Sequence, residues 1–328
     1  KELDIRKPNY YLEAKKDSVG QAVGDIIQKS EEVLKKENPD AVLVLGDTNS
    51  CLAAYMAKRM HIPVYHMEAG NRCFDFNVPE ETNRRIIDHI ADFNLVYTEH
   101  ARRHLISEGL LHRRIYLTGS PLNEVLNFYK SKINESEILH ELNLESNKYF
   151  LASIHREENV DYENNLKQIL KILNFLAKEY ELPVIVSTHP RTRNRLEALK
   201  SDRSEAQDVI KFLKPFGFLA YNKLQMNAKC VLSDSGSISE ESAILNFPAV
   251  TIRNSMERPE AIDAGTIILT GLDRNIILKS IQVVTDEFER DKKYSQIPAE
   301  YKITNTSYRV VKILLGTAKL SNKWWGVN

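Results

Sequence analysis

Acidic residues follow two consecutive short apolar runs in the first half of the chain. Asp47 comes after the run at 41–46, Glu68 ends the next, and Glu80 follows Pro79 at the start of a predicted helix. Neighbouring parallel strands lie about 4.8 Å apart, so Asp47 and Glu68 are expected at one sheet edge. Close carboxylates raise one another's pKa, which suits general acid/base chemistry. Helix capping and dipole contacts are the alternative roles.

Basic residues follow two apolar runs of the second half. His155 is followed by an arginine, and the next run ends at His189, with Arg191 and Arg193 close behind. This pattern predicts an anion site at the strand ends. Structural histidines and solvated arginines are the alternative.

A serine-rich turn is the most informative segment of the second half. The backbone N–H groups of Ser235, Gly236 and Ser237 are placed to face a phosphate at the start of a helix. A capping box between Ser237 and residue 240 is the alternative. Glu241 would have to face neutral hydroxyls, such as those of a ribose, because a diphosphate would repel it. Arg258 offers a cation before another Pro-started helix, or simply belongs to that helix start.

The elements that must position these residues alternate in the manner of a parallel α/β sheet, with short runs rich in Val and Ile between amphipathic stretches. Helices are predicted at 18–36 and around 166–176. The predicted strands lie at 41–46, 63–67, 93–98, 114–119, 149–154, 183–188, 209–213, 229–234, 249–253 and 266–271.

The economical interpretation is two Rossmann-like, doubly wound parallel-sheet domains. We expect the first at 1–145, with a C-terminal helix at 305–328 packed on it, and the second at 146–304.

The composition narrows the function classes. The chain of 328 residues has 45 Lys+Arg and 45 Asp+Glu, which argues against a nucleic-acid or anionic-membrane surface. No apolar run reaches the roughly 18 residues of a membrane span, so a cytoplasmic protein is expected. The three cysteines lack metal-site spacing and are predicted to be reduced thiols. Walker, dinucleotide, hydrolase-elbow and zinc-protease motifs are not present in the sequence.

Six motifs, in order, resemble the non-hydrolysing UDP-N-acetylglucosamine 2-epimerases over almost the whole chain. They are GDT (46–48), HMEAGNR (66–72), VPEETNRR (78–85), IHRE (154–157), DSGSISEE (234–241) and ERPEAIDAG (257–265). The resemblance implies a glycosyltransferase-B-like fold, an active site in the cleft, a UDP-sugar substrate and a homodimer, with no metal and no nicotinamide cofactor. It also implies that UDP leaves C1 as C2 loses its proton, which gives a 2-acetamidoglycal. UDP then adds back to C1, and C2 is protonated on the other face.

Matching the motifs residue by residue carries roles to this chain. The resemblance implies that Asp47, Glu68 and Glu80 are the catalytic carboxylates and that His155 lies at the diphosphate. Phosphate, ribose and other substrate contacts are implied for Ser235, Gly236, Ser237, Glu241 and Arg258, and a place near the uracil for Tyr221. Phe216 falls where some members have a Gln that contacts the base.

The family begins with a strand and a loop whose Arg, with a nearby Lys, touches the diphosphate. Neither is present here, so a further strand, loop and helix are expected before Lys1. They would also pair the apolar edge of the run at 41–46.

The substrate and the reaction class stay open. The stretch 71–78 resembles the branch that acts on UDP-2-acetamido-2,6-dideoxy-L-talose to make UDP-L-FucNAc, where Phe74 and Phe76 would face a 6-methyl group. Two core aromatics are the alternative. A glycosyltransferase of the same fold, or a UDP-sugar-binding protein without catalysis, remains a more remote possibility. The leading prediction is an isomerase that interconverts UDP-GlcNAc and UDP-ManNAc for surface polysaccharide synthesis.

Overall fold

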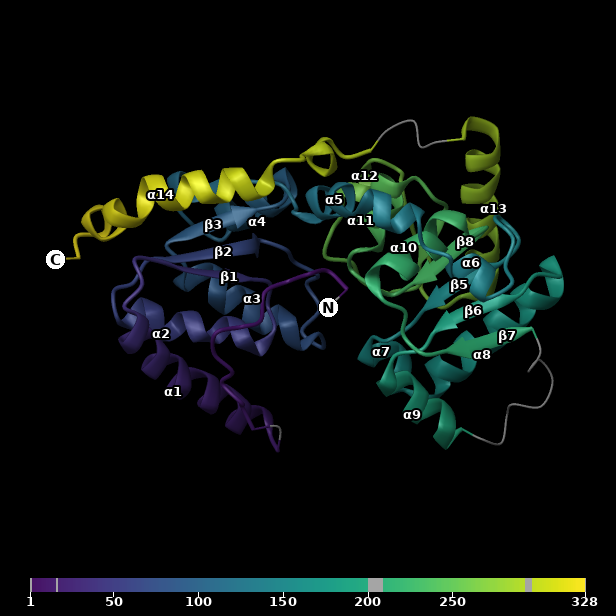
Figure 1. Ribbon diagram of the computed structural model, residues 1–328, viewed down its shortest axis with the longest axis horizontal. Helices are drawn as coiled ribbons and strands as arrows, with labels where there is room; N and C mark the ends of the chain where they lie inside the picture. Colours follow the sequence, from purple (N-terminus) through teal and green to yellow (C-terminus); the bar gives the residue numbers. More distant parts are fainter. Residues whose placement is uncertain (1, 16, 200–208, 293–296, 328) are drawn as a thin grey trace. The chain divides into compact units, whose positions relative to one another are not determined.

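The chain folds into two compact units in the computed structural model, which describes residues 2–15, 17–199, 209–292 and 297–327 (Figure 1). The first unit comprises Leu3–Glu124 and Ile303–Asn328, and the second comprises Val125–Lys302. The division falls within helix α5 (Leu122–Asn134). Residues 125–145 therefore group with the second unit.

The first unit is built on a four-stranded parallel sheet in the order β1-β2-β3-β4. Its strands are β1 (Val42–Leu45), β2 (Val64–Ala69), β3 (Phe93–Val96) and β4 (Ile115–Leu117). Its helices are α1 (Val19–Glu37), η1 (Asn49–Leu52), α2 (Ala53–Arg59), α3 (Pro79–Ile90), α4 (Glu99–Ser107), η2 (His112–Arg114) and α14 (Thr306–Trp325).

Local sequence signals set where two of these helices begin. The Ser18 side chain accepts a hydrogen bond from the N–H of Gln21 at the start of α1, and Thr98 does the same for Ala101 at the start of α4. Each hydroxyl thereby satisfies a backbone donor that the helix itself leaves without a partner.

The C-terminal helix α14 packs against the sheet of the first unit. Its Val310 joins a buried cluster with Tyr65 and Phe93, and the Tyr65 hydroxyl lies 2.6 Å from that of Thr317. The last helix of the chain thus completes the core of the first unit.

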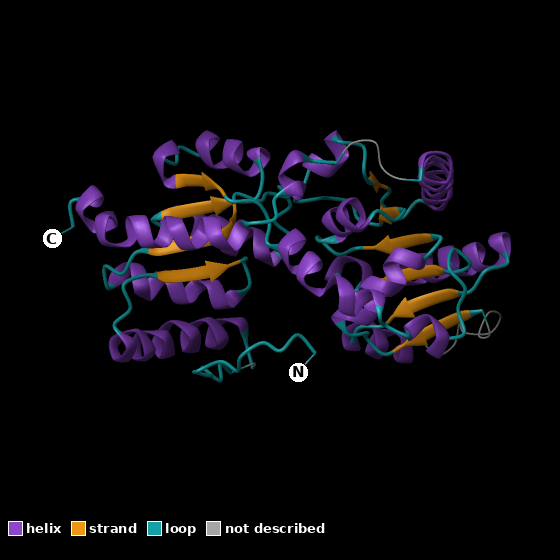
Figure 2. Ribbon diagram, turned by 45° about the horizontal axis from the view of Figure 1, so that its top comes forward, coloured by secondary structure: helices purple, strands orange, loops and turns teal. Residues whose placement is uncertain are grey.

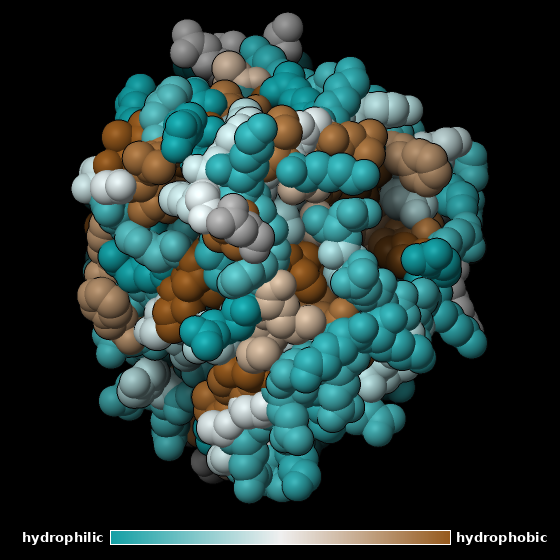
Figure 3. Space-filling model, turned by 90° about the vertical axis from the view of Figure 1, so that its left-hand side faces the viewer, coloured by the Kyte–Doolittle hydropathy of each residue, from teal (hydrophilic) through white to brown (hydrophobic). Residues whose placement is uncertain are grey.

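The outer residues of β1 remain exposed. Leu43 is 44% exposed and Leu45 is 58% exposed. Apolar side chains of the molecule also reach the surface elsewhere, where they are interrupted by polar ones, on the face seen in Figure 3. Isolated exposed leucines are common in folded proteins and do not by themselves mark a site.

The second unit contains a six-stranded parallel sheet in the order β10-β9-β8-β5-β6-β7. Its strands are β5 (Phe150–Ser153), β6 (Val184–Ser187), β7 (Ile210–Leu213), β8 (Cys230–Ser233), β9 (Ala249–Thr251) and β10 (Ile268–Leu269). Its helices, besides α5, are α6 (Ile138–Glu141), α7 (Glu157–Val160), α8 (Glu163–Tyr180), α9 (Pro190–Ala198), α10 (Phe218–Asn227), α11 (Ile238–Leu245), α12 (Glu260–Asp263), α13 (Arg274–Asp291) and η3 (Ala299–Lys302).

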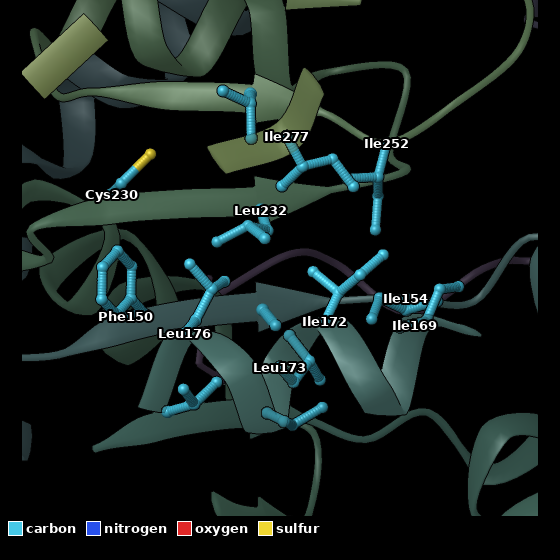
Figure 4. Close-up of a cluster of buried hydrophobic side chains, with 14 of the residues drawn as sticks. Phe150, Ile154, Ile169, Ile172, Leu173, Leu176, Cys230, Leu232, Ile252 and Ile277 are labelled. Atoms are coloured by element: carbon cyan, nitrogen blue, oxygen red, sulfur yellow. The ribbon is translucent and has the colours of Figure 1, made fainter. Parts of the chain in front are cut away.

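Helices accompany the strands of both units (Figure 2). In the second unit, Leu173 and Leu176 of α8 and Ile277 of α13 point into one buried cluster with Phe150 and Leu232 of the central strands (Figure 4). The apolar face of α8 therefore seals one side of this sheet.

The strand order of the second unit is that of a Rossmann fold, because the chain starts at the central β5, winds outward to β7 and then returns to β8 beside β5. The topological switch point, where ligands bind in such sheets, lies between β5 and β8. The predicted α/β class and parallel sheets are confirmed, and each of the ten predicted runs overlaps a strand, although β2 extends to Ala69, two residues beyond the run at 63–67.

The cysteines also match the sequence prediction. Cys51, Cys73 and Cys230 are free and buried. Within the described residues, no helix is both long and apolar enough to span a membrane.

Candidate active site

The three predicted carboxylates come together in the first unit. Asp47 follows Gly46 at the end of β1, Glu68 lies on β2, and Glu80 is in the first turn of α3. Burial raises the pKa of Asp47, Arg84 opposes this rise, and the negative charges of Glu68 and Glu80 add to it. Asp47 is therefore the carboxyl with the raised pKa that the sequence analysis expected.

Glu68 has a backbone conformation that is rare for a residue with a side chain. Its φ is 68°, and the pairing of β2 with β3 shifts register between Met67 and Ala69. Such a conformation costs on the order of 1–3 kcal/mol and persists where the surrounding structure enforces it. The irregularity aims Glu68 at Gly46, where an added Cβ would lie 3.3 Å from Glu68 Oε2.

Arg84 is the partner of Asp47. It lies one helical turn after Glu80 on α3, and its Nε and Nη2 approach Asp47 Oδ2 at 2.8 and 2.7 Å. The alternative role of Asp47 as a helix cap is wrong, since Thr48 occupies the cap position of η1. Sequence reasoning missed Arg84, although the motif at 78–85 contains it.

A buried histidine and a buried aspartate lie close to the turn that carries Asp47. His66 and Asp88 are fully buried, and His66 Nδ1 lies 2.8 Å from Asp88 Oδ1. Asp88 also accepts hydrogen bonds from the Gly70 N–H and from Arg72. The sequence analysis did not identify this pair as functional, and only its place in the motif at 66–72 pointed to His66.

In the second unit, Asp234 holds the loop that carries His155. It accepts hydrogen bonds from the backbone N–H groups of His155 and Arg156 and from the Asn159 side chain, and His155 Nδ1 lies 3.1 Å away. Burial alone would raise the pKa of Asp234, but these contacts, led by His155, lower it. Because Asp234 holds Nδ1 of His155, the other ring nitrogen, Nε2, points away from this carboxylate.

The serine-rich turn lies beside this loop, at the switch point of the sheet. Ser235 Oγ and Ser237 Oγ are 3.0 Å apart, and Ser237 donates to Glu241 Oε1 at 2.9 Å. The capping-box alternative is wrong, because the Ser237 side chain caps no backbone N–H of α11. The Arg156 Nη2 atom would lie 3.5 Å from a Cβ at Gly236, so a guanidinium borders the turn.

Glu241 gathers the other predicted substrate contacts. Burial raises its pKa, while hydrogen bonds from Gln225 and Ser237 and the charge of Arg258 lower it. Arg258 itself pairs with Glu240. Burial raises the pKa of Tyr221, and the charge of Glu241 adds to this effect. The structure thus brings Tyr221, Ser237, Glu241 and Arg258 into one cluster.

The second basic loop contributes less than the sequence suggested. The His189 ring centroid lies 6.1 Å from that of His155, but Arg191 pairs with Glu157 and keeps 42% of its side chain exposed. Arg191 therefore fits the solvated alternative. Among the residues described, no group of three or more His, Cys, Asp or Glu side chains has an arrangement that would hold a metal ion.

Comparisons with known proteins place the chain in a family. The model of the family described as UDP-N-acetylglucosamine 2-epimerase matches residues 1–315. A curated UDP-N-acetylglucosamine 2-epimerase of Methanococcus maripaludis is 37% identical in an alignment of 296 residues, and the match covers 86% of this chain and 78% of that protein.

Solved structures agree with this match. The structure of UDP-N-acetylglucosamine 2-epimerase from Rickettsia bellii has a TM-score of 0.93 and 48% identity, and the alignment covers 99% of this chain and 86% of that one. The Methanocaldococcus jannaschii UDP-GlcNAc 2-epimerase, solved in complex with UDP-GlcNAc and UDP, has a TM-score of 0.87 and 33% identity, with 96% and 86% covered.

A likeness at 7% identity and a TM-score of 0.53 to a UDP-forming trehalose-phosphate synthase of Burkholderia vietnamiensis concerns the fold alone, and it agrees with the expected glycosyltransferase-B-like architecture. The ordered motifs, the two parallel-sheet units and these matches lead to one assignment. The chain belongs to the UDP-N-acetylglucosamine 2-epimerase family, and it is an isomerase.

Proposed function

We propose that this protein interconverts UDP-GlcNAc and UDP-ManNAc by eliminating UDP and adding it back across a 2-acetamidoglycal. The observation that carries the proposal is the grouping of Asp47 and Glu68, at the ends of two strands, with Glu80 in the first turn of α3; the charges of Glu68 and Glu80 add to the effect of burial in raising the pKa of Asp47. A group that takes a proton from C2 and one that returns it to the other face are both needed. Carboxyl groups in different protonation states supply this pair.

The second unit supports a role in holding UDP. The serine-rich turn lies at the switch point of a Rossmann sheet, with the Arg156 guanidinium beside it. His155, oriented by Asp234, adds a donor for a diphosphate. We assign Glu241 to the ribose hydroxyls, Tyr221 to the base and Arg258 to a further substrate contact.

The test is turnover of UDP-GlcNAc in D₂O by the wild-type protein and by D47N, E68Q and E80Q. The wild type is expected to form UDP-ManNAc with deuterium at C2, because the abstracted proton exchanges with solvent. Each amide variant is expected to lower kcat by about 100-fold or more while UDP binding persists. The exposed acidic residues Asp40 and Glu32 provide matched controls, D40N and E32Q, which are expected to retain full turnover.

Four results separate the alternatives. Near-normal kcat in all three amide variants refutes the assignment of the carboxylates. Epimerised product without deuterium excludes proton exchange through the glycal. Turnover only when a sugar acceptor is added would identify a glycosyltransferase, and UDP-sugar binding without turnover would identify a binding protein.

A 6-deoxy sugar is the second candidate substrate, because Phe74 and Phe76 are not core residues. They are 65% and 72% exposed in the loop between Glu68 and Glu80, and both rings lie against Arg85. The core alternative for these aromatics is therefore wrong. Comparing kcat/KM for UDP-GlcNAc with kcat/KM for UDP-2-acetamido-2,6-dideoxy-L-talose decides between the two substrates. F74A and F76A should lower kcat/KM for the 6-deoxy sugar relative to UDP-GlcNAc only if the rings contact C6.

The proposal extends to the cellular context that the family resemblance suggests. We expect a cytoplasmic homodimer whose product feeds surface polysaccharide synthesis. Sedimentation of the purified protein measures its oligomeric state.

A further inference from the structure

Acidic and basic side chains of the first unit form a continuous series of ion pairs and hydrogen bonds that includes Asp47. It starts at Asp47, which pairs with Arg84 at 2.7 Å. Arg84 Nη1 then lies 3.3 Å from Glu81 Oε2, and Glu81 Oε1 accepts from Arg85 Nε at 3.0 Å. Arg85 Nη1 reaches Glu108 Oε1 at 3.3 Å.

The series of ion pairs continues from Glu108 back toward β1. Arg72 binds Glu108 through Nε at 2.8 Å and Nη2 at 2.6 Å, and its Nη1 lies 2.7 Å from Asp88 Oδ2. His66 Nδ1 follows at 2.8 Å from Asp88 Oδ1, and His66 Nε2 lies 3.1 Å from the carbonyl oxygen of Gly46. Gly46 is the peptide neighbour of Asp47, so the series closes into a ring.

The hydrogen-bond partners of His66 indicate which of its two ring nitrogens carry a hydrogen. The Gly46 carbonyl can only accept, so Nε2 must carry a hydrogen. Asp88 accepts from Arg72 and from the Gly70 N–H, which marks it as an ionised carboxylate without a proton to offer. Nδ1 must therefore also carry a hydrogen, and a ring with two N–H groups is an imidazolium.

The group is buried as well as connected. His66, Asp88 and Glu81 are fully buried and Arg72 is 1% exposed, so a charge here that lacked a hydrogen-bonded partner would be costly.

We propose that His66 is a positioning residue of this enzyme, held as an imidazolium that fixes the Gly46–Asp47 turn against the strand that carries Glu68. His66 and Glu68 lie two residues apart on β2. The same strand therefore carries the Glu68 carboxylate and the residue that holds the Gly46–Asp47 turn in place. Asp88 lies on α3 and accepts a hydrogen bond from the Gly70 N–H, so it connects His66 to the helix whose first turn contains Glu80. The inference rests on the proposed roles of Asp47, Glu68 and Glu80.

The experiment compares two substitutions of His66 that keep different contacts. In H66Q the side-chain amide reaches the Gly46 carbonyl as Nε2 does, whereas the shorter side chain of H66N does not. We expect kcat to fall in the order wild type, H66Q, H66N, by up to about 100-fold in H66N, because small displacements of reacting groups have effects of this size. KM is expected to change little, since the proposed UDP contacts lie in the other unit. H112Q, at an exposed histidine of the same unit, is the matched control.

Nitrogen-15 NMR of the His66 ring in the wild-type protein provides a readout that does not depend on how the variants fold. Both ring nitrogens are expected to carry protons at neutral pH. A neutral tautomer would overturn the imidazolium, and equal kcat in H66Q, H66N and wild type would overturn the positioning role. If D47N, E68Q and E80Q also keep full kcat, the proposed function itself has failed; if they lose kcat while H66N keeps it, only the inference about His66 has failed.

Discussion

Arg84 contacts Asp47 with two nitrogens, Nε at 2.8 Å and Nη2 at 2.7 Å, both directed at Oδ2. The Arg84 side chain is only 6% exposed, so this pair is little screened by water. Arg84 counteracts the effect of burial, which would otherwise raise the pKa of Asp47 still more. The protonation of a proposed catalytic group thus depends on a residue of a different element.

Replacing Arg84 with methionine should raise the pKa of Asp47 further. The cation favours the charged carboxylate, and its removal leaves burial together with the negative charges of Glu68 and Glu80. Carbon-13 NMR of the Asp47 carboxyl measures this pKa in R84M and in R103M, a control at an exposed arginine of α4. An unchanged or lowered pKa in R84M would contradict the electrostatic account.

The strained backbone of Glu68 predicts a conflict between stability and activity. At a φ of 68°, glycine should be more favourable than alanine by about 1–2 kcal/mol. We therefore expect E68G to unfold at higher urea concentration than E68A, although both lose turnover. Equal stability of the two variants would show that residue 68 leaves this conformation when the carboxylate is removed.

Glu108 should make the stability of the protein depend on pH in the acid range. Burial tends to raise its pKa, but the hydrogen bonds and charge of Arg72, with help from His89 and Arg85, lower it to about 2. Because the folded value lies below the usual glutamate pKa of about 4.3, the stabilising contribution is complete above that pH and disappears as the pH falls toward 2.

The substitution E108Q tests this dependence. We expect it to cost on the order of 1 kcal/mol at neutral pH, a modest figure because a fifth of the side chain remains exposed. The difference between E108Q and wild type should shrink in urea unfolding experiments as the pH is lowered below about 4. A difference that stays constant with pH would argue against an ionic origin.

Asp234 should control which nitrogen of His155 carries the proton. As a carboxylate it accepts from Nδ1, so the proton is held on the side that faces Asp234. An amide in D234N can donate to Nδ1 instead, which would move the proton to the other nitrogen. We expect a fall in turnover of about 10-fold or more, with the changed tautomer visible by nitrogen-15 NMR.

H140Q, at an exposed histidine of α6, serves as the control for this experiment. A changed tautomer with undiminished turnover would mean that His155 does not act through its free nitrogen. An unchanged tautomer would mean that the backbone contacts of the loop, rather than Asp234, orient the ring.

The sequence alone determined the alternation of strands and helices, since Val- and Ile-rich runs and amphipathic periodicity are local properties. It also placed Asp47, Glu68 and the serine-rich turn at strand ends, because parallel strands direct their carboxyl ends to one edge. Six ordered motifs identified the family.

The tertiary structure decided which neighbours those residues acquire. Arg84 meets Asp47, and Asp234 meets His155, across long separations in the chain, and no spacing rule predicts such pairs. The positive φ of Glu68 likewise arises where the pairing of β2 is irregular, and the exposure of Phe74 and Phe76 arises from the path of the loop that follows β2. Burial and the distances between charges set protonation, and both exist only once the chain has folded.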